Sequence, residues 1–254
     1  MPAPLISIIV PAFNEAESLP LLAQEIQEAM GESAWELLIV DDGSTDGTVT
    51  VIHALCKQNP RIRGFTLARH AGKGDALAVG MHHARGRMVV TMDADLQNDP
   101  KDIPLLLAAL TGGADAALGW RQERADSLGK RWASALFNRT CTLAFGERLH
   151  DANTGFKALR RETLVYAPLH GGLYRFLPHI LIHRGWHVVE VPVHHRPRRF
   201  GRTKYSFLHR LKGIPDLLTA LIAAHAESDA LLPHHTAIAR PVAKQEAPSA
   251  MMRP

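Results

Sequence analysis

Cysteine and long apolar runs are scarce in this sequence, and each absence excludes a class of protein. Two cysteines, Cys56 and Cys141, occur in 254 residues. This number excludes a disulfide-rich scaffold, and we expect both to be free thiols of a cytoplasmic protein. No stretch of about 18 apolar residues is present, so we expect no transmembrane helix. The amino terminus lacks a basic region before its short apolar run, and we expect no signal peptide.

Two common binding motifs are also missing. Adjacent histidines occur at 82/83, 194/195 and 234/235. Neighbouring residues do not share a helix face, and no cysteine or acid completes a zinc pattern around them. The stretch RHAGKGD at 69–75 lacks the four residues that a Walker A loop places between its first glycine and Gly-Lys. We therefore predict neither a zinc site at the histidine pairs nor a Walker A nucleotide site.

Positive and negative charges are distributed unevenly along the chain. Hydrophobic residues make up 46% and charged residues 21%, an ordinary globular composition. Residues 1–110 contain 8 Lys and Arg against 14 Asp and Glu, whereas residues 111–254 contain 21 against 11. This asymmetry suggests an acidic half that binds metal and nucleotide, joined to a basic half that faces phosphates or an anionic surface.

Apolar runs and helical patterns alternate along the chain. Strands are predicted at 5–10, 35–40, 62–67, 88–92, 154–160 and 187–193, with a further short apolar run at 114–118. Helices are predicted at 16–30, 48–59, 128–145 and 176–183, and another opens in the loop 69–75 and continues to residue 84. The alternation predicts βαβ units and a parallel sheet, which is an α/β fold.

The chain is expected to form one domain over residues 1–225 and a tail. Residues 1–110 would be its nucleotide and metal half, and residues 111–212 its acceptor half. An amphipathic helical pattern with basic residues spans 206–225, and it fits either a membrane interface or packing on the domain. Residues 226–254 are rich in Ala, Pro, His and Ser, which predicts a mostly disordered tail.

Two aspartates, one residue apart, follow the predicted strand at 88–92. Asp93 and Asp95 lie where the apolar run turns polar, in VVTMDADLQNDP. Ligands of open α/β sheets bind beyond the carboxyl ends of the strands, and close carboxylates repel each other unless a cation lies between them. Mg²⁺ or Mn²⁺ is the natural cation, because both bind carboxylate and phosphate oxygens. The alternative is an acidic turn that caps the helix starting near Asp102.

Three other predicted strands also end in polar residues. Glu15 follows the first strand, Asp41 and Asp42 follow the second, and Lys73 lies in the glycine turn after the third. Such carboxylates can accept hydrogen bonds from a base or ribose, and a lysine at a helix N-terminus can hold a diphosphate. Each loop taken alone could be a capped turn with no ligand. Together they line one edge of the sheet and predict a nucleotide-diphosphate and metal site.

Four of these stretches, in their order and spacing, resemble one family. VPAFNE, VDDGSTDGT, GKGDAL and MDADLQNDP are similar to the motifs of family 2 glycosyltransferases. GWR at 119–121, DANTGFKALRRE at 151–162 and RRFGRTKYSFLHR at 198–210 resemble the polyprenyl-phosphate, dolichol-phosphate mannosyltransferase-like branch. The resemblance covers about residues 5 to 212. It implies the GT-A fold, a Rossmann-like, mostly parallel twisted sheet with flanking helices.

The resemblance also implies roles for the matching residues. Pro11, Glu15 and Asp42 would hold the base and ribose of a nucleotide-sugar donor. Asp93 and Asp95 would hold the metal on the donor diphosphate, with Gln97 beside them. The residues implied to receive the phosphates of donor and acceptor are Arg121, Arg131, Arg198 and Lys204. A helix-face position exposed to solvent is an equally good interpretation of Arg131.

The acceptor decides whether the reaction needs a base. A polyprenyl phosphate is already ionised at neutral pH, whereas a sugar hydroxyl needs a general base within hydrogen-bond reach. The carboxylates available for that task are Asp95, Asp126 and Asp151. Direct attack at the anomeric carbon would invert its configuration, as it does in this family.

We therefore predict a metal-dependent, inverting glycosyltransferase of the hexosyltransferase class that uses a GDP- or UDP-sugar and a polyprenyl phosphate. The alternative is transfer to a sugar hydroxyl in polysaccharide or glycolipid assembly. Residues 196–212 contain seven Lys and Arg and no acid, which suits phosphates or an anionic membrane. We expect a cytoplasmic protein, peripheral on the membrane face, with a membrane-protein partner. Nucleic-acid binding is disfavoured, because the acidic strand ends repel phosphates unless they hold metal.

Overall fold

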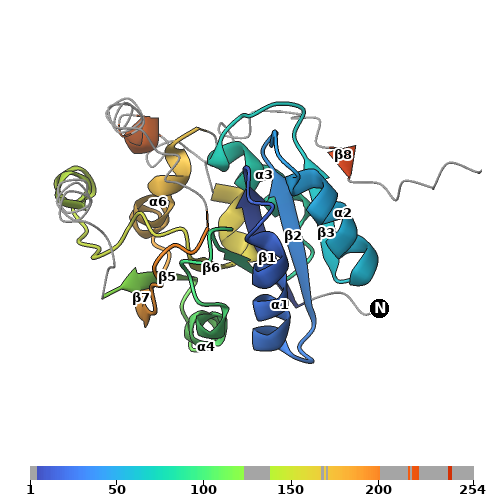
Figure 1. The fold of residues 1–254 in the computed structure, drawn as a ribbon. Coiled ribbons are helices and arrows are strands. Elements are labelled where there is room, and N and C mark those ends of the chain that lie inside the picture. Colours follow the sequence, from blue (N-terminus) through green and yellow to red (C-terminus); the bar gives the residue numbers. More distant parts are fainter. Residues whose placement is uncertain are drawn as a thin grey trace, which may run out of the picture.

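A mixed β-sheet with helices on both faces organises the chain (Figure 1). The structure is a computed structural model and describes residues 5–122, 138–166, 169, 171–200, 217, 219–222 and 240–241. The strands are β1 (Ile6–Ala12), β2 (Trp35–Asp41), β3 (Ile62–Thr66), β4 (Met88–Thr91), β5 (Ala116–Arg121), β6 (Lys157–Arg160), β7 (Val188–Val193) and β8 (Arg240–Pro241).

Most neighbouring strands of the sheet are parallel. Within the described residues the order is β7-β5-β6-β4-β1-β2-β3-β8. β6 runs antiparallel to both β4 and β5, and β8 runs antiparallel to β3, while the other neighbours are parallel. The predicted α/β fold with a mostly parallel sheet is confirmed.

Helices cover both faces of the sheet (Figure 1). They are α1 (Leu19–Met30), α2 (Thr48–Gln58), α3 (Lys73–His83), α4 (Ile103–Thr111) and α6 (Leu177–His183), with short 3₁₀ segments η1 (Pro100–Asp102), η2 (Arg161–Tyr166) and η3 (Leu173–Arg175). Ile8 of β1 belongs to one cluster of buried residues with Ile26 of α1 and the apolar side of α4. Ile9, which points the other way, packs with Leu77 of α3 and Leu177 of α6. Because β1 is covered on both faces, its sequence is apolar apart from Ser7, whose hydroxyl donates to the buried Glu36.

The topology places several strand ends at one edge of the sheet. β1, β2, β3 and β4 run in the same direction, so the loops that follow them lie together. The antiparallel β6 begins at this same edge, where Lys157 pairs with Thr91 of β4 and with Leu118 of β5. The segment that precedes β6 is thereby brought beside the residues that follow β4.

Two predicted elements begin three residues later in the structure than expected. The strand predicted at 154–160 begins only at Lys157, because residues 151–156 form a turn. The helix predicted at 16–30 begins at Leu19, because the Ser18 N–H and hydroxyl both bond back to Glu15 and close a turn first. In both places the departure occurs at the edge of the sheet where the strand-end acids lie.

Several predictions concern residues outside the described part of the chain. Arg131 and Lys204 are among them, together with most of the amphipathic region 206–225. Of the predicted tail at 226–254, only β8 is described. Of the predicted helix at 128–145, residues 138–145 are described, and they are helical.

Both cysteines are free thiols, as predicted. Cys141 is buried with Phe176, Ile180 and Ala220, and burial raises the pKa of its thiol to about 12. Cys56 is partly buried. None of the helices in the described ranges combines the length and the apolar composition that a membrane crossing requires.

Helix α3 lies close against β1 at Gly80. A Cβ atom added to Gly80 would lie 2.3 Å from Cγ2 of Ile9. A Gly to Ala change inside a helix normally gains about 1 kcal/mol of helix stability. We predict that Gly80→Ala nevertheless lowers the free energy of unfolding by about 1–3 kcal/mol, because it overpacks this contact. Denaturant titration measures the change.

The control is the double variant Ile9→Ala, Gly80→Ala. Removing Cγ2 of Ile9 relieves the clash, so the costs of the two changes should be clearly less than additive. A Gly80→Ala protein as stable as the wild type would contradict the close packing of α3 on β1.

Candidate active site

Asp93 and Asp95 lie directly after β4, and each is paired with a cation. Oδ1 of Asp93 accepts a hydrogen bond from Nζ of Lys73, and Oδ2 of Asp95 accepts one from Nη2 of Arg198. Lys73 is the first residue of α3, and Arg198 lies in the segment after β7. Two acids and two cations from three distant parts of the chain therefore meet at the edge of the sheet.

The pKa values of the two acids shift in opposite directions. Burial alone would raise the pKa of Asp93, but Lys73 and, more weakly, Arg121 lower it below its usual value. Burial and the charge of Asp93 raise the pKa of Asp95, against the opposing effect of Arg198. Opposite shifts of this kind occur when two carboxylates are too close to hold two negative charges unaided.

The turn at 151–156 brings Gly155 against Asp93. A Cβ atom on Gly155 would lie 2.5 Å from Oδ2 of Asp93, so a larger residue would displace the carboxylate. The Thr91 hydroxyl donates to the Gly155 carbonyl at 2.9 Å and fixes this approach. Lys157 is buried below the turn and donates to one of its carbonyls. Burial lowers the pKa of Lys157 to about 7.

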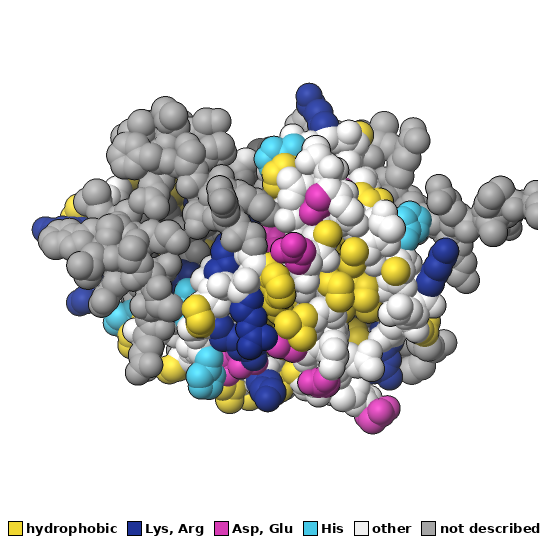
Figure 2. Space-filling view, in the orientation of Figure 1, with side chains coloured by type: hydrophobic (Ala, Val, Ile, Leu, Met, Phe, Trp, Pro, Cys, Tyr) yellow, Lys and Arg dark blue, Asp and Glu magenta, His cyan; other side chains and the backbone are white. Residues whose placement is uncertain are grey.

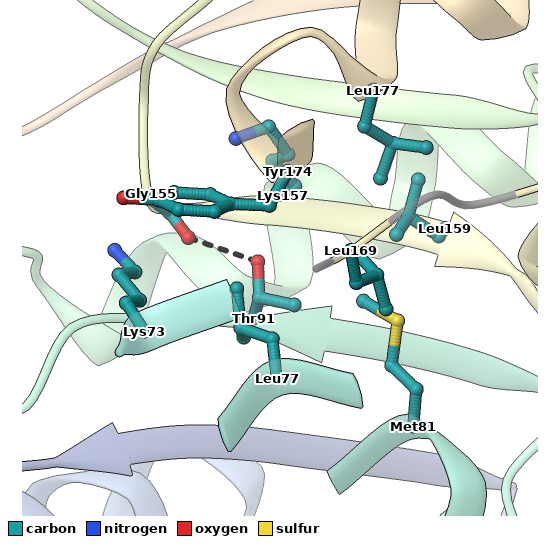
Figure 3. Close-up of a pocket in the computed structure, with 10 residues that line it drawn as sticks. All are labelled: Lys73, Leu77, Met81, Thr91, Gly155, Lys157, Leu159, Leu169, Tyr174 and Leu177. Carbon is teal, nitrogen blue, oxygen red and sulfur yellow. Dashed lines mark hydrogen bonds between the residues drawn. The ribbon is translucent and has the colours of Figure 1, made fainter. Parts of the chain in front are cut away.

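A pocket opens beside this turn (Figure 3). The polar side chains of its lining are those of Lys73, Thr91, Lys157 and Tyr174, and Nζ of Lys73 lies 5.5 Å from the centroid of the Tyr174 ring. Its apolar lining consists of Leu77, Met81, Leu159, Leu169 and Leu177. The pocket therefore combines two lysines with an apolar interior next to Asp93.

The loops after β1 and β2 are joined by hydrogen bonds. Asn14, which has a φ of 52°, accepts a bond from the Thr45 N–H at 2.8 Å, and its own N–H donates to Oγ of Ser44 at 2.8 Å. The Glu15 N–H donates to the Thr48 hydroxyl, also at 2.8 Å. The two loops thus form one unit at the edge of the sheet.

Asp42 organises the loop before α3. Its buried carboxylate accepts hydrogen bonds from the N–H groups of Ala71 and Gly72 at 2.8 and 3.0 Å, and Nδ1 of His70 lies 2.9 Å from its Oδ2 atom. The His70 ring stacks on Phe13, with centroids 4.2 Å apart. In the structure these carboxylate oxygens accept hydrogen bonds from the protein's own backbone. The predicted contact of Asp42 with a base or ribose stays a prediction.

Arg121 and Asp151 form a bidentate ion pair at the end of β5. Nε and Nη2 of Arg121 donate to the two oxygens of Asp151 at 2.7 and 2.9 Å. Asp151 is fully buried, and its N–H donates to Glu190, which also holds the His150 ring. Because both carboxylate oxygens accept from Arg121, Asp151 orients the guanidinium group in this arrangement.

The segment after β7 is attached to the loop that carries Asp95. The Arg196 N–H donates to the Gln97 carbonyl at 2.8 Å, and the Gln97 N–H donates to Asp95 at 3.3 Å. The guanidinium of Arg196 binds Glu25 at 2.7 Å and Asp99 at 2.6 Å. These contacts hold the backbone near residue 198 in place and direct Arg198 toward Asp95.

The structure brings together much of the predicted site. The residues that meet around the end of β4 are Lys73, Asp93, Asp95, Gln97 and Arg198. Arg121 and Asp151 lie at the end of β5, while Pro11, Glu15 and Asp42 lie at the ends of β1 and β2. Among the described residues, no three His, Cys, Asp or Glu side chains form a metal cluster. A cation at Asp93 and Asp95 would therefore need further ligands from a substrate or from water.

Three residues at the site carried no clear signal in the sequence. Lys157 is a single lysine in a strand, and its burial depends on the antiparallel pairing of β6. Gly155 precedes this strand, and its contact with Asp93 is not local. Arg196 is one arginine in a basic run, and only its acidic partners distinguish it. The available signals were this basic run and the stretch DANTGFKALRRE at 151–162, which contains Gly155 and Lys157.

Comparison with known proteins agrees with the fold. The model of the family described as glycosyl transferase family 2 matches residues 7–165. A solved structure of glucosyl-3-phosphoglycerate synthase from Mycobacterium tuberculosis with Mn²⁺ and UDP-glucose is 22% identical, with a TM-score of 0.67, and the match covers 87% of this chain and 79% of that one. A mycobacterial protein is 23% identical, with a TM-score of 0.69 and coverage of 87% and 75%. At these identities the likeness shows the fold.

His194 offers a test of how the segment after β7 is held against the loop that follows β4. Its Nδ1 atom lies 2.9 Å from Oδ1 of the buried Asp102, and its N–H donates to the same carboxylate. The hydrogen bond and charge of Asp102 raise the pKa of His194, Asp99 adds to the effect, and Arg196 opposes it. We predict a His194 pKa above the ordinary histidine value of about 6.5 in an NMR titration of the folded protein.

The sign of the pH effect follows from the raised pKa. The pair stabilises the folded protein fully below the unfolded-state pKa of His194, and this contribution is lost as the pH rises through the folded-state value. Asp102→Asn should bring the His194 pKa down. A His194 pKa at or below the ordinary value in the wild type would contradict the pairing.

Proposed function

The chain belongs to glycosyl transferase family 2, and from this premise we propose that it is a metal-dependent, inverting enzyme that transfers a sugar from a UDP- or GDP-sugar to a polyprenyl phosphate. The observation that carries the proposal is the arrangement of Asp93 and Asp95 with Lys73 and Arg198 at the carboxyl edge of the sheet. Two acids suit a divalent cation there, and two cations suit a diphosphate.

Asp93 and Asp95 fit Mg²⁺ or Mn²⁺ as a pair of hard oxygen ligands. Mg²⁺ is typically bound by one or two carboxylates together with substrate phosphates and water, which matches a site with two acids. Bound there, the cation would stabilise the negative charge that develops on the leaving nucleoside diphosphate. The Mn²⁺ and UDP-glucose in the structure of the similar mycobacterial synthase support this choice of cofactor and donor.

The chain's own cations would share the diphosphate with the metal. Lys73 lies at the N-terminus of α3, and the positive end of a helix dipole also favours an anion. Arg198 and Arg121 present guanidinium groups from the segments after β7 and at the end of β5. Arg131 and Lys204, outside the described residues, would extend this set toward the acceptor phosphate. Gln97 would keep Asp95 in position through its backbone N–H.

The nucleoside would lie along the joined loops after β1 and β2. Pro11 and Glu15 border this region from β1, and Asp42 borders it from β2. In this proposal Asp42 orders the loop at 70–72 beside the nucleoside through its bonds to the backbone. The stacked rings of Phe13 and His70 offer an aromatic surface at the same place.

The pairing of the carboxylates favours a phosphate acceptor. Transfer to a hydroxyl would need a carboxylate free to accept a proton. In the described residues the two carboxylates considered for this task, Asp95 and Asp151, are bound to Arg198 and Arg121. A phosphate acceptor needs no such base, and the arginines would attract it. The second candidate is a soluble phosphorylated acid, because phosphoglyceric acid is bound in a similar solved structure.

A basic surface supports contact with an anionic membrane. Lys and Arg side chains gather on the face shown in Figure 2, and the segment after β7 crosses α1 and the start of α4 through Arg196 and His194. Arg199 and Lys101 are exposed. We propose that the enzyme acts at the cytoplasmic membrane face as a peripheral protein, where a lipid-linked acceptor and a membrane-protein partner would meet it.

Donor binding tests the metal site. We predict that one of UDP-glucose, GDP-mannose and UDP-N-acetylglucosamine binds in calorimetry with Mn²⁺ and not with chelator. Asp95→Asn should weaken this binding by at least about tenfold, because a metal ligand is lost. The control is Asp115→Asn, which removes an acid at the opposite end of β5. Equal donor binding by Asp95→Asn and the wild type would exclude the metal site.

Acceptor choice tests the second half of the proposal. With the donor identified, product formation would be measured with undecaprenyl phosphate, 3-phosphoglycerate and soluble glycans. The proposal predicts transfer to the polyprenyl phosphate. Transfer only to 3-phosphoglycerate, or only to glycans, would leave the glycosyltransferase in place and reject the lipid acceptor.

A further inference from the structure

The two candidate metal ligands are already neutralised by the chain itself. Lys73 pairs with Asp93, and Arg198 pairs with Asp95. The side chains of Lys73 and Asp93 are 18% and 36% exposed, and those of Arg198 and Asp95 are 26% and 12% exposed, so water screens these partly buried pairs less than it would screen pairs on the open surface. Two negative and two positive charges balance at this place, as two carboxylates and one divalent cation would.

A divalent cation that entered this site alone would meet strong repulsion. It would have to take oxygens from Asp93 and Asp95 while an ammonium and a guanidinium remain a few ångströms away. Like charges at such distances inside a partly buried site are costly. Binding becomes favourable once Lys73 and Arg198 have another anion to pair with, and a diphosphate is such an anion.

Both cations can change partners without a movement of the backbone. The Lys73 ammonium ends a flexible four-carbon side chain, and the Tyr174 ring lies 5.5 Å from it. Hydrogen bonds between Arg196 and Gln97 hold the backbone before Arg198. The Arg198 guanidinium can therefore move by rotation about its side-chain bonds while the backbone stays in place.

We propose that Lys73 and Arg198 occupy the place of the divalent cation in the free enzyme and transfer to the diphosphate when the donor binds. The proposal rests on the proposed function, because it requires a diphosphate ligand at this site. It makes the metal and the nucleotide bind cooperatively, with each raising the affinity for the other by the same factor. When no donor is present, the two ion pairs thus lower the affinity of Asp93 and Asp95 for a divalent cation.

Mn²⁺ binding without nucleotide is the direct test. Electron paramagnetic resonance would measure free Mn²⁺ in titrations of the wild type, Lys73→Met and Arg198→Met, first alone and then with UDP or GDP. We expect each variant to bind Mn²⁺ alone about tenfold more tightly than the wild type. Each should also lose most of the gain in Mn²⁺ affinity that the nucleotide produces in the wild type.

Three variants serve as controls. Lys73→Arg and Arg198→Lys keep the positive charge and should bind Mn²⁺ alone as weakly as the wild type. Arg199→Met removes an exposed arginine from the same segment and should behave as the wild type in both titrations. Thermal unfolding of every variant would confirm that it is folded.

The two proposals fail in different ways. If UDP or GDP strengthens Mn²⁺ binding by the wild type, and Lys73→Met and Arg198→Met bind Mn²⁺ alone no more tightly than it does, the exchange is wrong and the metal site stands. If neither nucleotide affects Mn²⁺ binding by the wild type, the proposed function fails and the exchange fails with it.

Discussion

The repulsion between Asp93 and Asp95 is the constraint on which this site depends. Both carboxylates follow a buried strand and lie at an edge where water is partly excluded. Burial and the charge of Asp93 raise the pKa of Asp95, while Lys73 lowers the pKa of Asp93 against the effect of burial, as expected for two close carboxylates next to positive charge. Lys73 and Arg198 supply this charge in the free protein, and a divalent cation would supply it in the loaded enzyme.

The fold brings that positive charge from distant parts of the chain. The parallel strands β1 to β4 place their loops at one edge, and α3 begins there with Lys73. The antiparallel β6 returns to the same edge and places Gly155 against Asp93. The segment after β7 then crosses the loop after β4, where Arg196 holds it and Arg198 reaches Asp95. The second half of the chain thus completes a site that the first half begins.

The sheet and the strand-end acids were predictable from the sequence, and the partners of the acids were not. A buried parallel strand is a continuous apolar run, and Asp93 and Asp95 stand out where such a run ends. The pairing of Arg198 with Asp95 depends on how β7 is ordered in the sheet, which no local pattern encodes.

Asp42 and Asp151 show the same limit in another form. Their residue type and position indicated ligand binding or base catalysis. In the structure Asp42 binds the backbone of the loop before α3, and Asp151 is buried beneath Arg121. An ionised carboxylate at this edge of the sheet must accept hydrogen bonds from some donor. The sequence does not tell whether the donor belongs to the protein or to a ligand, and only the tertiary structure does.

The most direct test of the central claim is the anomalous diffraction of a crystal grown with Mn²⁺ and UDP or GDP. The account predicts a manganese peak between the carboxylates of Asp93 and Asp95, with Lys73 and Arg198 both turned toward the diphosphate. A nucleotide bound without manganese at these acids, or with both original ion pairs still formed, would contradict it.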